Sequence, residues 1–182
     1  MRILFWGTPD FAVPPLRALI GEGHDVIGIV TQPDKPRGRS RTQLDPSPVK
    51  RVALEEGLPV LQPEKPRGDE FLDAMRALAP DVSVVVAYGC ILPKAVIDLP
   101  PLGTLNIHGS ILPALRGAAP IQAAILDGLT ETGITIMQMC PHSMPATCCT
   151  CSAPRSRLTR RTANCTIACP SSARRPLYRR WP

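Results

Sequence analysis

The sequence has few aromatic residues and no long apolar run. Only 4% of its 182 residues are aromatic, yet 44% are hydrophobic, a content typical of a globular chain rather than a disordered one. No eighteen consecutive residues are apolar, which excludes a membrane-spanning helix. Asp10 and the prolines near it interrupt the N-terminal apolar stretch, so residues 1–15 are unlike a signal peptide. We therefore expect a cytoplasmic protein.

Acidic residues are absent after Glu131. Residues 1–139 contain 13 Lys and Arg against 15 Asp and Glu, whereas residues 140–182 contain eight Arg and no acid. The formal net charge of +6 therefore comes from the C-terminal segment, which also holds six of the seven cysteines. We expect a folded domain over 1–139 and a basic Cys/Arg/Pro-rich tail over 140–182. The tail has too few large apolar residues to offset the entropy of ordering, so we expect it to be irregular and disordered.

Strand and helix patterns alternate along the first 139 residues. This alternation predicts an α/β fold with a mostly parallel sheet. The expected strands are 3–6, 25–32, 81–89, 104–108 and 133–139, and the expected helices are 11–23, 48–57, 68–80 and 119–128. Residues 33–48, with four prolines and a basic alternation, are expected to form a long loop.

Two polar side chains share one face of the strand predicted at 104–108. Asn106 and His108 are two residues apart, so they point the same way near the carboxyl end of that strand. Ligands bind beyond this end in open parallel sheets. An amide can donate to a developing oxyanion and an imidazole can move a proton near neutral pH, which suits attack of an amine on an acyl carbon. The alternative is a capped strand end with a hydrogen-bonded histidine.

Six stretches, in order, resemble the methionyl-tRNA formyltransferase family. They are GTPDFAVPPL (7–16), TQPDKPRGR (31–39), PSPVK (46–50), VVVAYGCILPKAV (84–96), LNIHGSILP with RGAAPIQ (105–122), and TGITIMQM (132–139). The resemblance implies a Rossmann-like formyltransferase domain followed by a small β-barrel domain, which we expect this chain to lack. It implies formyl transfer from 10-formyltetrahydrofolate to the amino group of initiator Met-tRNA, by a monomer and without a metal.

The resemblance also assigns roles to individual residues. Asn106 would hold the formyl oxygen and His108 would transfer the proton. The folate would contact Ala87, Tyr88, Gly89, Ile91, Leu92, Ser110, Ile111, Leu112, Pro113 and Arg116. The basic loop would contact tRNA phosphates through Lys35, Arg37, Arg39 and Arg41. That loop departs from the family pattern at Ser40 and at residues 42–43, and its alternative reading is a solvated loop.

The resemblance ends after Met139, where the family has an LDTGD-type motif with a catalytic Asp. Residues 140–149 read CPHSMPATCC instead. Codons able to encode residues 142–149 permit Leu-Asp-Ala-Gly-Asp-Met-Leu when read two bases later. We therefore hypothesise a frameshift after Met139, and we expect weak or no activity from this chain.

Three alternatives stay open. The tail could bind zinc through cysteines and a histidine, although their spacing is irregular. These candidate ligands are His142, Cys148, Cys149, Cys151, Cys165 and Cys169. The chain could be a folate- or RNA-binding remnant without catalysis. It could also belong to a related folate-dependent formyltransferase, for glycinamide ribonucleotide or a sugar nucleotide, although residues 31–39 and 46–50 favour the tRNA enzyme.

Overall fold

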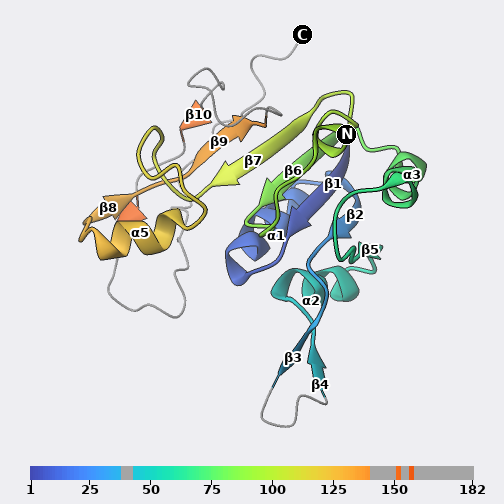
Figure 1. Cartoon of the computed structure of the whole chain (residues 1–182), viewed down its shortest axis with the longest axis horizontal. Coiled ribbons are helices and arrows are strands. Elements are labelled where there is room, and N and C mark those ends of the chain that lie inside the picture. The colour runs from blue at the N-terminus through green and yellow to red at the C-terminus, as the bar shows by residue number, and fades with distance from the viewer. Residues whose placement is uncertain (38–42, 140–150, 153–155, 158–182) are drawn as a thin grey trace.

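A seven-stranded mixed sheet forms the centre of the molecule (Figure 1). The computed structural model describes residues 1–37, 43–139, 151–152 and 156–157. The strand order is β10-β9-β7-β6-β1-β2-β5, and the pairs from β5 to β7 are parallel. The strands are β1 (Arg2–Gly7), β2 (Asp25–Val30), β5 (Val60–Leu61), β6 (Val82–Val86), β7 (Thr104–His108), β9 (Thr135–Gln138) and β10 (Cys151–Ser152). The predicted α/β fold with a mostly parallel sheet is confirmed.

Helices cover both faces of the sheet. The helical segments are η1 (Asp10–Ala12), α1 (Val13–Gly21), α2 (Pro48–Glu55), α3 (Asp69–Leu78), α4 (Lys94–Ile97) and α5 (Pro120–Leu126). On one face, buried residues of α1 and α2 pack against Ile3 and Phe5 of β1. On the other, α3 and α4 pack against Leu4 and Trp6. Because both faces of the central strands are covered, β1 and β6 are almost continuously apolar in sequence.

The hairpin after β2 corrects the loop prediction for residues 33–48. Strands β3 (Lys35–Arg37) and β4 (Gln43–Asp45) pair antiparallel, with Pro36 opposite Leu44. The short elements β5, α4 and β8 (Glu131–Thr132) were also not predicted. Each has at most four residues, too few to show a hydrophobic period in the sequence.

Two short strands lie beyond Met139, where the sequence predicted none. Strand β10 pairs antiparallel with β9, and β11 (Ser156–Arg157) pairs antiparallel with β8. Pairing at a sheet edge uses main-chain groups alone, so it needs no apolar pattern in the added strand. None of the helices in the described part of the chain is long and apolar enough to cross a lipid bilayer.

Candidate functional site

Asn106 and His108 lie on β7, the strand predicted over 104–108, and β7 runs between β6 and β9. Asn106 is in register with Val85 of β6 and Met137 of β9. Leu105 and Ile107 contact the core on the α1 and α2 side, so Asn106 and His108 point to the opposite side. Asn106 is half-buried, and within the described part of the chain its amide has no hydrogen-bond partner.

A hydrogen bond selects the tautomer of the neutral His108 ring. The side chain is 8% exposed, and its Nε2 lies 2.9 Å from the carbonyl oxygen of Leu115. A carbonyl oxygen can only accept, so Nε2 carries the hydrogen and donates it. In the neutral ring, Nδ1 is then the nitrogen that can accept a proton. The imidazole is thus held in one orientation with one basic nitrogen.

The turn after β7 places Leu115 for this contact. Ser110 Oγ donates to the carbonyl of Ala114 at 2.8 Å, and Leu115 adopts a positive φ of 54°. Thr135 Oγ1 donates to the Ser110 carbonyl at 2.7 Å and accepts from the Leu112 amide at 3.1 Å. Thr135 stands opposite His108 in the β7–β9 register. Sequence reasoning missed Thr135, which is buried at the start of β9.

Two glycines permit close packing at the carboxyl ends of β1 and β7. A Cβ on Gly7 would lie 2.7 Å from Ala12 Cβ, which is sterically forbidden without movement. A Cβ on Gly109 would lie 3.1 Å from a side-chain carbon of Ile121 and 3.5 Å from the Phe11 ring. These contacts join the ends of the two strands to η1 and α5 and so support the edge that holds His108.

Residues 87–92, along which the folate is expected to lie, are divided between surface and core. Ala87, Gly89, Cys90 and Ile91 are exposed, with Ile91 95% exposed, whereas Tyr88 and Leu92 are buried. Ala87 and Gly89 adopt positive φ angles of 46° and 90°. The exposed members can meet a ligand with side-chain or backbone atoms.

The Tyr88 side chain belongs to the core rather than to an open surface. It is 2% exposed, and its ring lies edge-on to Trp6 at a centroid distance of 5.2 Å. Its hydroxyl has no hydrogen-bond partner among the described residues. Burial, with a smaller contribution from Cys90, raises the pKa of Tyr88 to about 12. A ligand at residue 88 would therefore meet its backbone, whose carbonyl accepts from Thr8 Oγ1 at 3.1 Å.

The remaining predicted pocket residues lie in the turn after β7. Ile111, Pro113 and Arg116 are exposed, Leu112 is half-buried and Ser110 is buried. Arg116 Nε donates to the Pro113 carbonyl at 3.2 Å, so the guanidinium folds back over its own turn. Ser110 is used inside the turn, which leaves Ile111, Pro113 and Arg116 as the exposed side chains of this set.

Lys35 is the one predicted tRNA-contacting residue whose side chain the structure describes, and it is exposed on β3. The backbone of Arg37 ends that strand, while Arg39 and Arg41 lie outside the described residues. The hairpin of β3 and β4 projects from the body of the molecule beyond α2 (Figure 1).

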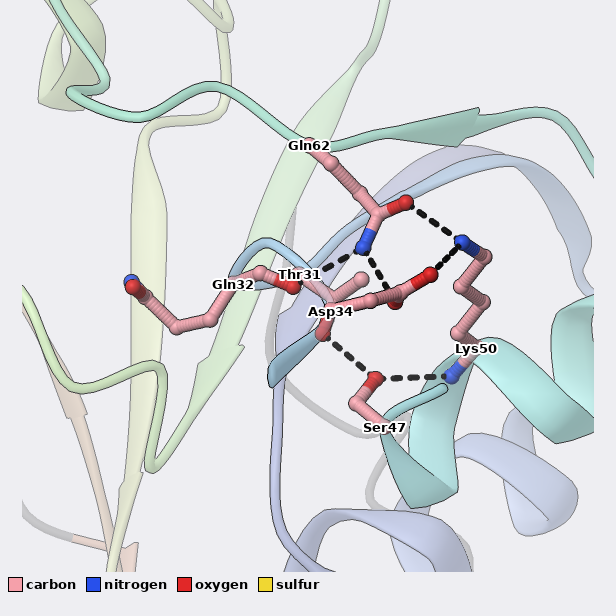
Figure 2. Close-up of polar contacts among 6 residues, drawn as sticks. All are labelled: Thr31, Gln32, Asp34, Ser47, Lys50 and Gln62. Atoms are coloured by element: carbon pink, nitrogen blue, oxygen red, sulfur yellow. Dashed lines mark hydrogen bonds and ion pairs between the residues drawn. The ribbon is translucent and has the colours of Figure 1, made fainter. Parts of the chain in front are cut away.

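A polar cluster that the sequence did not reveal lies at the base of this hairpin (Figure 2). Lys50 of α2 forms an ion pair with Asp34 and donates to Gln62 Oε1 at 2.7 Å. Gln62 Nε2 donates to Asp34 Oδ1 at 2.8 Å, closing a three-membered ring of contacts. The hydrogen bond from Lys50 is the largest cause that lowers the pKa of Asp34 below its usual value.

Two open hollows lie at the other end of the sheet. The larger, of about 540 Å³, is lined by residues including Asp81, which directly precedes β6, and Asp98 after α4. The smaller contacts Gly103, which directly precedes β7. Both are remote from the carboxyl end where His108 lies. Neither hollow therefore supports a ligand beside Asn106, and that placement is inferred from the sheet topology and from the chemistry of the side chains.

The zinc alternative falls on cysteines of the tail. His142, Cys148, Cys149, Cys165 and Cys169 lie outside the described residues, and only the backbone of Cys151 is described. Within the described residues, no three His, Cys, Asp or Glu side chains gather closely enough to hold a metal ion.

Comparison with known proteins decides the family. Residues 1–142 match the family model described as formyl transferase. The chain belongs to the formyl transferase family. It is 54% identical over 140 residues to a methionyl-tRNA formyltransferase of Sulfurihydrogenibium sp. (strain YO3AOP1), and the match covers 76% of this chain and 45% of the relative. A methionyl-tRNA formyltransferase of Bacillus pumilus (strain SAFR-032) is 58% identical over 138 residues, covering 76% and 43%.

Solved structures show the same fold at lower identity. Glycinamide ribonucleotide transformylase 1 from Geobacillus kaustophilus superposes with a TM-score of 0.64 at 17% identity, covering 87% of this chain and 84% of that one. A formyltetrahydrofolate deformylase from Pseudomonas syringae pv. tomato gives 0.59 at 19% identity, covering 88% and 52%. The chain spans less than half the length of the curated relatives it matches, 43–45% for the two above.

Proposed function

We propose that this formyl transferase moves a formyl group from 10-formyltetrahydrofolate to the amino group of initiator Met-tRNA. The observation that carries the proposal is the placement of Asn106 and His108 on one side of β7, at its carboxyl end. The chain is also more than half identical, over 138–140 residues, to relatives named methionyl-tRNA formyltransferase. The glycinamide ribonucleotide and sugar-nucleotide alternatives have no comparable support, because likeness to the transformylase structures is at the level of fold.

Each side chain has one role in the proposed reaction. The methionyl amine attacks the formyl carbon, and a new C–N bond forms as the carbonyl oxygen becomes an oxyanion. The Asn106 amide donates to this oxyanion, a type of contact worth about 10²–10³ in rate. His108 Nδ1 takes the proton from the attacking nitrogen and returns it to N10 of the folate. The bond from the formyl carbon to N10 then breaks, releasing tetrahydrofolate.

The donor is proposed to lie along the exposed residues of two neighbouring segments. Ala87, Gly89 and Ile91 follow β6, and Ile111 and Arg116 follow β7. Strands β6 and β7 are adjacent and parallel, so the two segments leave the same edge of the sheet side by side. Apolar groups suit the pterin, and the guanidinium of Arg116 suits a carboxylate of the folate tail.

We further expect this chain to turn over slowly. Residues 132–182 hold no Asp or Glu, so the family motif's Asp has no counterpart in the segment after Met139. The hydrogen-bond partner of His108 in the structure is the Leu115 carbonyl, which accepts from Nε2. A neutral carbonyl stabilises an imidazolium less than a carboxylate does, which lowers the driving force for proton transfer.

Formyl transfer by the full chain tests the proposal. Radiolabelled formyl incorporation into initiator Met-tRNA is measured for the wild type, for Asn106→Ala and His108→Ala, and for the control His24→Ala. His24 directly precedes β2. We expect the first two changes to reduce the rate by about 10²-fold or more, and the control to leave it unchanged. Equal rates for all four proteins, or transfer to glycinamide ribonucleotide instead, would contradict the assignment.

A second candidate is an RNA-binding remnant without catalysis. The observation in its favour is the charge asymmetry, with eight Arg and no acidic residue after position 139. Such a tail binds phosphates with a steep salt dependence. Binding that survives removal of residues 1–139, together with no formyl transfer by the full chain, would establish this candidate.

A further inference from the structure

We propose that Asp34, Lys50 and Gln62 act as a lock that orients the β3–β4 hairpin, making Lys50 a positioning residue for RNA contact by Lys35. This inference rests on the proposed function for its ligand. The lock itself rests on contacts among described residues (Figure 2).

Three separate elements meet in the lock. Asp34 directly precedes β3, Lys50 lies in the first turn of α2, and Gln62 directly follows β5. Besides its contacts to Lys50 and Asp34, Gln62 Nε2 donates to the Gln32 carbonyl at 3.0 Å. The chain segment entering the hairpin is therefore bound to a helix and to the edge of the main sheet.

The segment leaving the hairpin is tied down as well. Ser47, two residues after β4, caps α2 by accepting from the Lys50 amide at 3.1 Å. Its hydroxyl also lies 2.8 Å from Thr31 Oγ1, just after β2. Both ends of the hairpin are thus held within one bonded group (Figure 2), and the rotation of the hairpin against the sheet is restricted.

The burial of the ion pair distinguishes it from the other ion pairs. The side chains of Lys50 and Asp34 are 20% and 18% exposed. In the other ion pairs of the described residues, every side chain is at least 38% exposed. Lys50 is therefore occupied by protein partners, whereas Lys35 on β3 is exposed and can meet a phosphate.

Preorganisation is the physical consequence. A hairpin free to rotate would lose that freedom on binding RNA, and the loss would weaken affinity. A locked hairpin has already lost it during folding. Removing Asp34 then has two opposite effects on RNA affinity. The protein becomes more positive, which favours binding, but the hairpin becomes less restrained, which weakens it.

This opposition provides the test. Asp34→Ala and the control Asp98→Ala each delete one acid from a lysine pair, and Asp98 pairs with Lys94 on an exposed surface. Kd for initiator Met-tRNA is measured by fluorescence anisotropy on the full chain. We expect Asp34→Ala to weaken binding about 5-fold despite the added positive charge, and Asp98→Ala to leave Kd unchanged or tighten it slightly. Tighter binding by Asp34→Ala would overturn the lock.

A double-variant comparison separates this inference from the proposed function. Lys35→Ala with Arg37→Ala is made in the wild type and in Asp34→Ala. We expect it to weaken binding in the wild type and to change little in Asp34→Ala. If it changes nothing even in the wild type, the hairpin does not contact tRNA, and the acceptor part of the proposed function fails together with this inference. If it weakens binding equally in both backgrounds, only the lock is overturned.

Hydrogen exchange on the free protein tests the lock without RNA. The amides of Lys35 and Arg37 and of residues 43–45 are followed by mass spectrometry. We expect them to exchange about tenfold faster in Lys50→Met than in the wild type or in the control Lys94→Met, and Lys50→Arg to restore most of the protection. Equal exchange in Lys50→Met and Lys94→Met would also overturn the lock.

Discussion

Two polar regions at the carboxyl edge of the sheet are built in different ways. Around His108, side chains bind backbone carbonyls only a few residues away, as with His108 to Leu115 and Ser110 to Ala114. At the hairpin base, side chains bind one another across 12 to 28 residues, as with Lys50 to Gln62 and Gln62 to Asp34. The first arrangement shapes a turn, whereas the second fixes one element against another. Changes in the first region should therefore act on chemistry, and changes in the second on presentation of the hairpin.

Thr135 is the exception that tests this comparison most strongly, because it joins the His108 turn to a different strand. Thr135→Val keeps the shape but removes both bonds, to the Ser110 carbonyl and from the Leu112 amide. Leaving the buried Ser110 carbonyl and the half-buried Leu112 amide unpaired should cost about 2 kcal/mol of unfolding free energy. Urea unfolding measures this loss.

The tautomer of His108, measured in the same variant, tests whether Thr135 acts by supporting the turn. In the wild type, ¹⁵N NMR should show hydrogen on Nε2, as the contact with Leu115 requires. In Thr135→Val, with the turn released, both tautomers should be populated. An unchanged tautomer together with unchanged stability would mean that Thr135 does not support the turn.

The sequence predicted the strand of the first region and the face that carries its polar side chains, but it did not predict the contacts of the second region. The strand at 104–108 was predicted with its correct bounds, and the period of two correctly placed Asn106 and His108 on one face. Both predictions use only neighbours in sequence. The bond to Leu115 was out of reach, because it depends on the positive φ that Leu115 adopts in a particular turn.

The hairpin base depends instead on how distant segments meet. Asp34, Lys50 and Gln62 come from three segments whose relative placement is set by the parallel order of β1, β2 and β5. A short polar hairpin also lacks the alternating apolar pattern that indicates strands, so residues 33–48 were predicted as a loop. The contact of Thr135 with the His108 turn was missed for a similar reason, since it follows from the register of β7 with β9.

Acid should weaken the hairpin region selectively. The pKa of Asp34 is lowered chiefly by its hydrogen bond from Lys50, so the folded state favours the carboxylate. The stabilisation is fully present above the unfolded value near 3.8 and is lost as the pH falls below it through the folded pKa. The difference in unfolding free energy between wild type and Asp34→Asn should be about 1 kcal/mol at pH 6 and should shrink as the pH falls below 3.8. Thermal melts from pH 2.5 to 6 measure it, and a constant difference would contradict the ion pair.

Tyr88 differs from both regions, because its buried hydroxyl has no hydrogen-bond partner among the described residues. Tyr88→Phe removes a polar atom that contributes no bond, so we expect the unfolding free energy to change by no more than about 0.5 kcal/mol, in the stabilising direction.

The raised pKa of Tyr88, about 12, predicts a second effect, on the pH dependence of stability. The neutral Tyr88 side chain keeps its full contribution to the unfolding free energy below the unfolded pKa near 10, and this contribution is lost as the pH rises from there toward 12. The difference in unfolding free energy in favour of Tyr88→Phe should therefore grow over that interval. Absorbance at 295 nm in a Tyr178→Phe background isolates the titration of Tyr88, the sequence having only two tyrosines. A midpoint near 10 would show that the hydroxyl is reached by solvent, and a loss of stability in Tyr88→Phe like that expected for Thr135→Val would show that the hydroxyl is bonded.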